Sequence, residues 1–289
     1  MSANWHIGVI GGSGLAAGIG IENAQEIEVA SPFGAPSGPV TTGTLEGVRF
    51  TFLPRHGPGH AIPPAMVNYR ANIDVLKRCG VTDLIALSAI GSLNAAMAPG
   101  HFVAVDQFID RTTSRANSFF GPGLVAHVSL ADPVCPRLSA ELVEAARAEQ
   151  ATVHAGGCYL AMEGPQFSTR AESRLYQSWG ADVIGMTAMP EARLAREAEL
   201  PYALLAMVTD YDSWREAEEG VDAADVMRVM AENTRLARRV VRRFARQLPA
   251  SREASPIDRA LDNAIMTADD KRDPVLMARL HAVAGRVLR

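Results

Sequence analysis

The stretch Leu84-Ile85-Ala86-Leu87-Ser88-Ala89-Ile90-Gly91-Ser92 decides how this chain folds. It is apolar along most of its length, which predicts a strand whose two faces are both covered, as in the interior of a sheet packed between helices. The run ends in small residues, and open α/β sheets bind ligands outside the carboxyl ends of such strands. Ser88 and Ala89 are therefore candidate site residues.

Strands and helices alternate around this stretch. The alternation predicts an α/β fold with a single domain, in which a mixed central β-sheet is flanked by helices. We place this domain at residues 1–250 and expect residues 251–289 to form a C-terminal helical extension packing on it, with helical patterns at 258–266 and 274–287. Apolar runs predict the other strands at 6–10, 48–53, 101–106, 155–162, 182–185 and 202–208, and helical spacing predicts helices at 65–78, 138–147, 169–177, 190–198 and from 222 onward.

The composition limits the classes of partner. The chain has 289 residues, with 32 acidic and 28 basic side chains, so no general positive field attracts nucleic acid or an anionic membrane surface. One basic cluster follows the expected C-terminal helix, at 235–246. It has two interpretations, a solvated helix face or a nucleic-acid surface, and the absence of interleaved aromatic residues favours the solvated face.

The three cysteines, Cys79, Cys135 and Cys158, are widely spaced and include no C-x-x-C pair. This pattern argues against a disulfide framework and against a thiolate metal site, and it favours free thiols. No basic N-terminal region precedes an apolar run, and no segment approaches the ~18 apolar residues of a membrane span. We expect a soluble, cytoplasmic protein with no membrane partner.

Two strand ends carry residues that suit an anion. Gly11-Gly12-Ser13-Gly14 follows the first strand, where glycines let backbone N–H groups approach a phosphate; an ordinary tight turn is the alternative. Arg55 and His56 follow the strand predicted at 48–53. Arg55 offers a permanently charged fork of donors, and His56 offers a donor whose charge can change with the substrate. A structural loop is the alternative there. A metal site would need His56 and His60 on one helical face, which Gly57-Pro58-Gly59 prevents.

A second group of residues suits a flat, nitrogen-rich ligand. Phe167 supplies an aromatic face, Ser168 a hydroxyl, and Asp210 and Asp212 two carboxyl groups. An aromatic ring stacks on a planar base, and a carboxyl group can bond a ring nitrogen and an exocyclic amine. A base pocket beside an anion pocket suggests that a base is displaced from its sugar.

Motifs spread in order from residue 8 to about 230 carry a resemblance to a known family. The chain resembles the trimeric purine nucleoside phosphorylases, and within them the S-methyl-5'-thioadenosine phosphorylase branch. The matching stretches are Gly8-Val9-Ile10-Gly11-Gly12-Ser13-Gly14-Leu15, Arg55-His56-Gly57, Asn68-Tyr69-Arg70-Ala71-Asn72, Gly91-Ser92-Leu93, Asp106-Gln107-Phe108-Ile109-Asp110-Arg111-Thr112, Glu163-Gly164-Pro165-Gln166-Phe167-Ser168, Met186-Thr187 with Pro190-Glu191, and Thr209-Asp210-Tyr211-Asp212.

The resemblance implies a fold of the purine nucleoside phosphorylase type and a set of site residues. Met186 would lie against the ribose hydroxyls, with Phe167 and Ser168 on the base. Asp210 would be the general acid at N7 of the departing base, and Asp212 would order it and help to read the 6-amino group. A carboxyl group in that role needs a pKa raised by burial or by its neighbour. The phosphate-binding residues would be Ser13, Arg55, His56, Ser88, Ala89 and Thr187, with His56 also counted as catalytic.

The resemblance also implies the substrate class. Asp210 stands where relatives that act on 6-oxopurines carry Asn, so this sequence is similar to adenine-type enzymes. A 5'-methylthio group needs an apolar pocket, for which Val226 and Met227 are candidates, together with His127 reaching from a neighbouring subunit. His127 lies in a long loop over 112–132, and a plain surface histidine is the other interpretation.

The expected activity is phosphorolysis of S-methyl-5'-thioadenosine to adenine and 5-methylthio-α-D-ribose 1-phosphate. No metal or organic cofactor is implied; inorganic phosphate is the co-substrate, and the expected assembly is a homotrimer. Two alternatives stay open at this point. One is a phosphorylase for adenosine, inosine or methylthioinosine, and the other is a non-catalytic nucleoside or nucleic-acid binding module.

Overall fold

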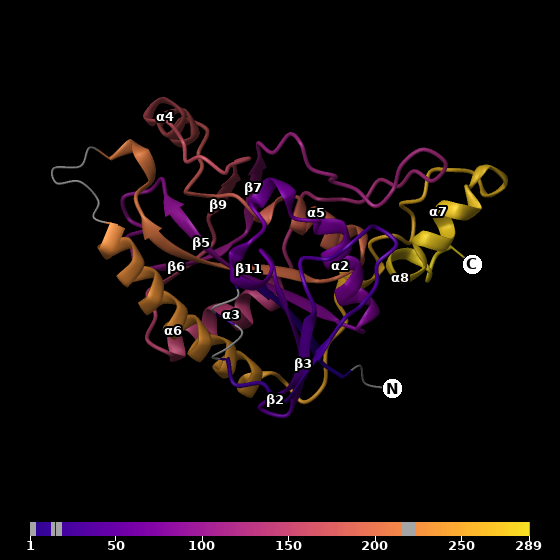
Figure 1. The fold of residues 1–289 in the computed structure, drawn as a ribbon, viewed down its shortest axis with the longest axis horizontal. Coiled ribbons are helices and arrows are strands. Elements are labelled where there is room, and N and C mark those ends of the chain that lie inside the picture. The colour runs from indigo at the N-terminus through magenta and orange to yellow at the C-terminus, as the bar shows by residue number, and fades with distance from the viewer. Residues whose placement is uncertain (1–3, 13–14, 16–18, 216–222, 289) are drawn as a thin grey trace.

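The computed structural model describes residues 4–12, 15, 19–215 and 223–288, with the backbone alone at 223–226. Strands and helices alternate along these residues (Figure 1). The strands are β1 (His6–Gly11), β2 (Glu22–Ile27), β3 (Val40–Leu45), β4 (Val48–Pro54), β5 (Asp83–Ser92), β6 (Phe102–Val105), β7 (Gln107–Asp110), β8 (Val153–Ala155), β9 (Cys158–Ala161), β10 (Val183–Gly185) and β11 (Tyr202–Asp210). The helices are α2 (Tyr69–Arg78), α3 (Pro136–Ala148), α4 (Arg170–Ser178), α5 (Ala188–Glu197), α6 (Ala223–Gln247), α7 (Pro274–Arg279) and α8 (His281–Ala284).

Strand β5 is the centre of the sheet. It runs parallel to β1 along residues Asp83–Ala86 and parallel to β11 from Leu84 to Gly91. At its carboxyl end, Gly91 and Ser92 pair with the antiparallel strand β10. The sheet order is β2-β3-β4-β1-β5-β10-β9-β7, while β11, β6 and β8 branch from β5. The sequence prediction of one α/β domain with a mixed sheet is confirmed.

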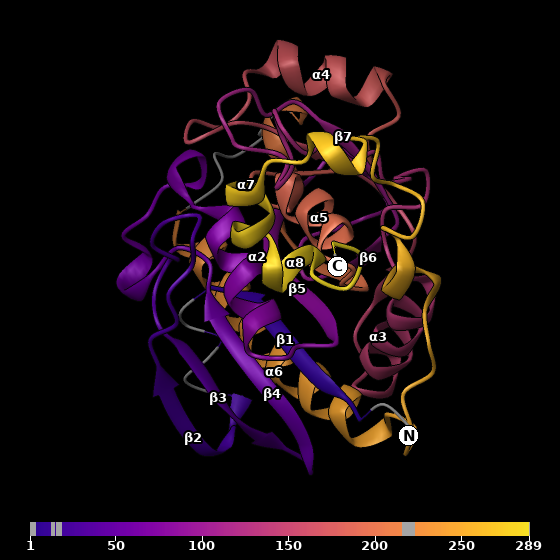
Figure 2. The same ribbon diagram turned by 90° about the vertical axis from the view of Figure 1, so that its right-hand side faces the viewer.

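The two faces of β5 supply two separate cores. Leu84, Ala86 and Ile90 belong to a cluster under α2 and α5, whereas Ile85 and Leu87 belong to a cluster under α3 and α6. Because successive residues of a strand point to opposite faces, an unbroken apolar run can fill both clusters. Figures 1 and 2 show the helices on opposite sides of the sheet.

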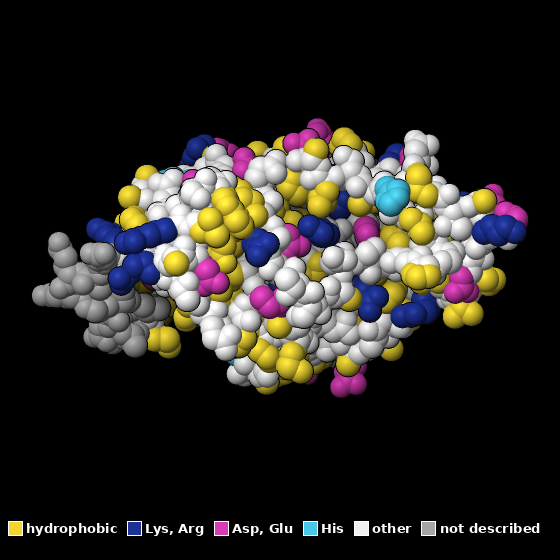
Figure 3. Space-filling view, turned by 90° about the horizontal axis from the view of Figure 1, so that it is seen from above, with side chains coloured by type: hydrophobic (Ala, Val, Ile, Leu, Met, Phe, Trp, Pro, Cys, Tyr) yellow, Lys and Arg dark blue, Asp and Glu magenta, His cyan; other side chains and the backbone are white. Residues whose placement is uncertain are grey.

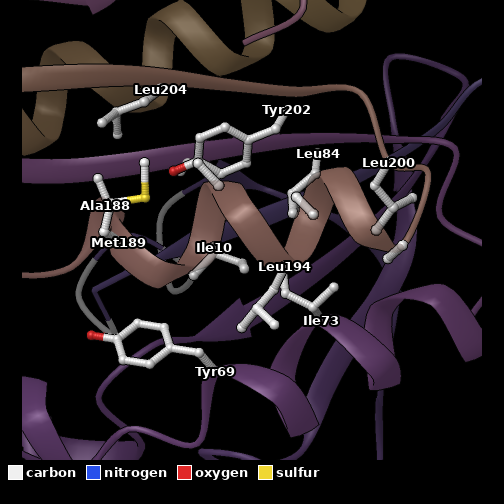
Figure 4. Close-up of a cluster of buried hydrophobic side chains, with 14 of the residues drawn as sticks. Ile10, Tyr69, Ile73, Leu84, Ala188, Met189, Leu194, Leu200, Tyr202 and Leu204 are labelled. Atoms are coloured by element: carbon white, nitrogen blue, oxygen red, sulfur yellow. The ribbon is translucent and has the colours of Figure 1, made fainter. Parts of the chain in front are cut away.

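Helix α5 packs directly on the sheet. Leu194 of α5 lies near Ile73 of α2, and Ile10 and Leu84 approach the same cluster from β1 and β5 (Figure 4). All four side chains are buried. Burial of one such side chain contributes about 1.5–3 kcal/mol relative to leaving it in water. The packing fixes α5, which follows the site residue Thr187, against the sheet.

The residues after 250 pack on the same core. Leu261, Leu280 and Val283 are buried in the cluster of α2 and α5. The predicted helix at 258–266 is wrong, because this segment is a short 3-10 helix at Pro256–Arg259 followed by turns. Asp and Asn side chains compete for backbone hydrogen bonds, which disfavours a helix through Asp262 and Asn263. The predicted helix at 274–287 is instead the short pair α7 and α8.

Three other predictions needed correction. The sequence analysis missed the strands β2, β3 and β7; all six residues of β2 are exposed, so no buried face marks the strand in the sequence. Helix α2 begins after residue 65, because the side chain of Asn68 accepts from the N–H of Ala71 and so caps it. The strand predicted at 155–162 is two strands, separated by Gly156 and Gly157, which adopt positive φ angles of 105° and 151°.

The arginines of α6 form ion pairs across the surface. Arg239 and Arg243 contact Glu149, and Arg242 and Arg246 contact Glu46. Exposed pairs of this kind contribute about 0–1 kcal/mol each. The pairing supports the interpretation of this cluster as a solvated helix face. On the face of the molecule seen in Figure 3, acidic and basic side chains are likewise interspersed.

Candidate active site

A cavity of about 380 Å³ opens at the carboxyl ends of β4, β5 and β11. These strands lie in one parallel part of the sheet, so the residues at their ends meet at one edge. Met186 and Thr187, which precede α5, and one face of α6 also line the cavity. Nine of the residues predicted from the sequence line it: Arg55, His56, Ser88, Ala89, Phe167, Met186, Thr187, Asp210 and Asp212.

One wall, which we call the anion side, consists of Arg55, His56, Ser88 and Thr187. The hydroxyl groups of Ser88 and Thr187 lie 3.3 Å apart. Thr187 precedes α5, yet its hydroxyl makes no capping bond to that helix. Two neighbouring hydroxyl groups beside a helix N-terminus can donate to the oxygens of a bound anion.

Arg55 is held by a buried carboxylate. Its side chain is only 3% exposed, and its Nε and Nη2 donate to the two carboxylate oxygens of Glu191 at 2.8 and 3.1 Å. Its Nη1 and Nη2 also donate to the carbonyl oxygens of Leu87 and Ile10, and Tyr202 donates to Glu191. Burial alone would lower the pKa of Arg55, but Glu191 raises the pKa above its usual value. Arg55 is therefore a charged group whose orientation is fixed before a ligand arrives.

His56 is neutral at physiological pH. Burial, followed by the charge of Arg55, lowers its pKa to about 4, although a bond to the carbonyl oxygen of Ile62 acts in the other direction. That bond joins Nδ1 and Ile62 O at 2.8 Å, so Nδ1 carries the proton and Nε2 is an acceptor. The ring of His60 stacks on it with centroids 4.1 Å apart. The sequence predicted a donor at this position, whereas Nε2 of His56 is an acceptor suited to a protonated anion oxygen.

The opposite wall, which we call the carboxylate side, consists of Phe167, Asp210 and Asp212. Oδ2 of Asp210 accepts from the hydroxyl of Thr209 at 2.7 Å, and Oδ1 accepts from the backbone N–H of Asp212 at 2.9 Å. These two bonds fix the plane of the Asp210 carboxyl group.

Asp212 is itself bonded by the hydroxyl of Ser173. Burial raises the pKa of Asp212, and the neighbouring charge of Asp210 raises it further. Both effects favour the protonated form of Asp212 over its carboxylate.

Phe167 is 79% exposed at the mouth of the cavity, where it can stack on a planar ligand. Ser168 does not line the cavity. Its side chain is buried, its hydroxyl lies 3.6 Å from the sulfur of Met162, and its carbonyl oxygen accepts from Ser213. Within this chain, Ser168 supports the wall rather than facing the space.

The predicted 5' residues are placed differently from one another. Met227 is 65% exposed and lies outside the cavity, whereas Met230, one turn later on α6, lines it. His127 is exposed, and its backbone N–H donates to Ala264 O. Ser13 and the side chain of Val226 lie outside the described residues.

Sequence reasoning missed several residues of the cavity. Asn233 and Thr234 of α6 line it beside Met230, and their helical spacing places them on one face. The side chain of Asn233 is buried and donates to Val208 O. Glu191 was quoted only as part of a motif, and its pairing with Arg55 across 136 positions had no local signal.

No group of three or more His, Cys, Asp or Glu residues within the described ranges could hold a metal ion. The three cysteines are free. Of the helices in the part of the chain that the structure describes, none has the length and apolar character that a membrane crossing requires.

Comparisons with known proteins agree with this geometry. A family model described as "Phosphorylase superfamily" matches residues 6–246. The S-methyl-5'-thioadenosine phosphorylase of Cereibacter sphaeroides is 59% identical over 98% of both chains, and that of Bradyrhizobium diazoefficiens is 55% identical over the same shares. Among solved structures, a methylthioadenosine phosphorylase from an Antarctic soil metagenomic library has a TM-score of 0.92 at 41% identity, covering 97% of this chain and 99% of that one.

Proposed function

This chain belongs to the phosphorylase superfamily, and on that premise we propose that it catalyses the phosphorolysis of S-methyl-5'-thioadenosine, giving adenine and 5-methylthio-α-D-ribose 1-phosphate. The observation that carries the proposal is the presence of both walls in one cavity. An anion bound at Ser88 and Thr187 would face a base held between Phe167 and Asp210. Relatives at 45–59% identity bear the corresponding name.

The reaction follows from the two walls. A phosphate oxygen forms a bond to the anomeric carbon, and the bond between that carbon and the base nitrogen breaks. The electron pair passes into the base, and Asp210, as the carboxylic acid, donates its proton to N7. The P–OH group that phosphate brings can form a hydrogen bond to Nε2 of His56. The P–OH proton passes to solvent as the sugar 1-phosphate forms, and Asp210 takes up one proton from solvent before the next turnover, so the reaction balances.

The residues on the anion side have separate roles in this proposal. Arg55, fixed by Glu191, provides positive charge where the phosphate is held. The hydroxyl groups of Ser88 and Thr187 orient the attacking oxygens. We include Ser13 and Ala89 in this half-site on the family resemblance. The reaction needs phosphate as co-substrate, and we propose that it needs no metal or organic cofactor.

On the carboxylate side, Phe167 would stack on adenine and Met186 would contact the ribose. We propose that Ser168 serves the base half-site through its support of this wall. Asp212, whose backbone N–H donates to Oδ1 of Asp210, would order that carboxyl group and help to read the 6-amino group. For the 5'-methylthio group we propose Met230 in addition to Val226, Met227 and His127, because Met230 lines the cavity.

The proposal also includes the location, the assembly and the domain division of the protein. We propose a cytoplasmic homotrimer in which His127 contacts the site of a neighbouring subunit. We propose that residues 1–250 form the phosphorylase domain and that residues 251–289 are a C-terminal extension packing on it. Analytical ultracentrifugation of the purified protein tests the assembly; a single monomeric species at the concentrations used for activity would contradict it.

A substrate panel tests the function. Purified protein is incubated with methylthioadenosine, adenosine, inosine and methylthioinosine, each with and without phosphate. We expect fastest base release from methylthioadenosine, and release only with phosphate. Adenosine is the second candidate, because a Schistosoma mansoni relative at 37% identity is described as an adenosine/methylthioadenosine phosphorylase. Faster release from inosine would contradict the proposed reading of the 6-amino group.

A further inference from the structure

Arg115 occupies an unusual position for a loop arginine. It belongs to the segment 112–132, which contains no helix or strand element, and the neighbouring residues Ser114 and Ala116 are exposed. Its own side chain is only 1% exposed. A buried guanidinium group is costly unless its charge is paired and its donors are used. Its contacts therefore indicate what this side chain does.

The contacts of Arg115 converge from segments far apart in the sequence. They include one carboxylate oxygen, one phenol oxygen and four backbone carbonyl oxygens. The guanidinium fork is planar and carries five N–H donors, which suits it to hold several acceptors at once. The distances are 3.0 Å from Nε to Glu163 Oε1; 3.0, 2.5 and 2.7 Å from Nη1 to Tyr69 Oη, Met186 O and Met189 O; and 2.7 and 3.5 Å from Nη2 to Glu163 O and Met162 O.

These carbonyl groups belong to both walls of the cavity. Met162 follows β9 and leads into the segment that carries Phe167, while Met186 follows β10 and leads into Thr187. Met162 and Met186 both line the cavity. The two segments are also in close contact, since a Cβ added to Gly164 would lie 2.5 Å from the sulfur of Met186. Arg115 lies behind this junction and bonds to both sides of it.

Glu163 completes the anchor. Its carboxylate accepts from the backbone N–H groups of Thr113 at 2.5 Å and Ser114 at 3.1 Å, as well as from Arg115. Although partial burial opposes the shift, these donors lower the pKa of Glu163 to about 2. The carboxylate is therefore charged throughout the neutral range, and it both balances Arg115 and ties the loop backbone to the base-side segment.

We infer that Arg115 is a positioning residue that holds the Phe167 segment and the Met186-Thr187 segment in a fixed relation. It has no place among the cavity-lining residues, so it acts through the backbone that it bonds. The inference about catalysis rests on the proposed function. The placement of the two segments rests on the contacts alone.

Kinetics of Arg115→Ala and Arg115→Lys test the inference. Misplacement of reacting groups by about 1 Å can cost about 100-fold in rate, so we expect kcat/KM to fall about 100-fold for Arg115→Ala, with raised KM values for both nucleoside and phosphate. Guanidinium ion added at concentrations that leave the wild type unaffected should restore at least part of the lost rate to Arg115→Ala. Arg115→Lys keeps the charge but loses the fork, so it should fold and still show both raised KM values.

Arg252→Met is the matched control. Arg252 is also buried and bonds to Asp83, to Asp258 and to Thr82 O, but it lies away from the cavity. We expect a lower melting temperature for this variant and unchanged KM values. Wild-type KM values in Arg115→Lys, or equal KM changes in Arg252→Met, would overturn the inference. If the wild type shows no phosphorolysis, the proposed function fails; calorimetric binding of adenine and of phosphate to wild type and Arg115→Lys still tests the positioning, and equal affinities would overturn it.

Discussion

The two walls of the cavity differ in how the protein holds them without a ligand. On the anion side, Arg55 is nearly inaccessible and forms a double hydrogen bond with Glu191, so its charge is compensated within the free protein. On the carboxylate side, Phe167 is mostly exposed and projects at the cavity mouth. The anion side is part of the core, whereas the carboxylate side combines Asp210, at the end of the central strand β11, with the exposed ring of Phe167.

Because of this difference, substitutions on the two walls should affect the stability of the fold and the affinity for ligands differently. Removing one partner of a buried ion pair leaves an uncompensated charge, which destabilises the fold whether or not a ligand is present. An exposed aromatic ring gains most of its contacts only when a ligand covers it. Substitutions on the anion side should therefore lower stability as well as binding, and substitutions at Phe167 should lower binding alone.

The largest effect is expected from Asp210→Asn. An amide cannot donate a carboxyl proton to the base, and general acid catalysis contributes about 100- to 10,000-fold. We expect kcat for methylthioadenosine to fall within that range. The affinity for phosphate, measured by calorimetry, should stay at the wild-type value because the anion side is untouched. A kcat equal to that of the wild type would show that another group protonates the base.

Glu191→Gln addresses the anion side. The substitution leaves Arg55 without its counter-charge in a buried site, which should cost about 3–5 kcal/mol of unfolding free energy. Urea denaturation measures this loss of unfolding free energy. Glu149→Gln is the control, since this carboxylate pairs with exposed Arg239 and Arg243 and should contribute only about 0–1 kcal/mol. Similar losses in the two variants would contradict the contrast between the walls.

Phe167→Ala addresses the carboxylate side. Stacking of a base on an aromatic ring contributes about 1–3 kcal/mol, so we expect the nucleoside KM to rise by a factor of about 5 to 150. The phosphate KM and the melting temperature should not change. Leu175→Ala, at another exposed apolar side chain outside the cavity, should change neither KM. A lower melting temperature for Phe167→Ala would show that this wall is also part of the core.

A further prediction concerns pH. Burial lowers the pKa of both His56 and His6 to about 4, from an ordinary value of 6.5. The unfolded chain therefore binds these protons first, and unfolding free energy should fall as the pH drops from about 6.5 to 4. His6 lies in β1 and bonds to Thr51, away from the cavity.

Substitution of either histidine by Gln should weaken this dependence, as measured by thermal unfolding across that pH window. Only His56→Gln should raise the KM for phosphate. If His6→Gln raised it equally, the assignment of His56 to the anion side would lose its support.

The sequence predicted those parts of the fold that leave a local pattern. The apolar run of β5 marks a central strand because both of its faces are buried. Strand β2 leaves no such pattern, since it is an exposed edge strand, mostly of polar residues, that pairs with β3. Backbone pairing at an edge has no requirement for apolar side chains, and so sequence periodicity could not show it.

The candidate site was predictable to a similar extent. Arg55, Thr187 and Asp210 stand at or just after strand ends, and Ser88 lies in the last half of β5. This position made them candidates together with their side-chain chemistry and the family resemblance. The contacts behind them were not predictable, because the carboxylate of Glu191 meets its donor Arg55, and Arg115 meets its acceptors, only through the tertiary arrangement. Met227 and Met230 lie one turn apart on α6, and the sequence did not show which of them lines the cavity, because both fit an apolar helix face.

The most direct test of the account follows phosphate itself. Purified protein, methylthioadenosine and inorganic phosphate are mixed, and ³¹P NMR is recorded while adenine is measured by chromatography. If both walls act in one cavity, inorganic phosphate should disappear in a one-to-one ratio with adenine formed, and a sugar 1-phosphate signal should replace it. Release of adenine with unchanged phosphate and free 5-methylthioribose would contradict the account.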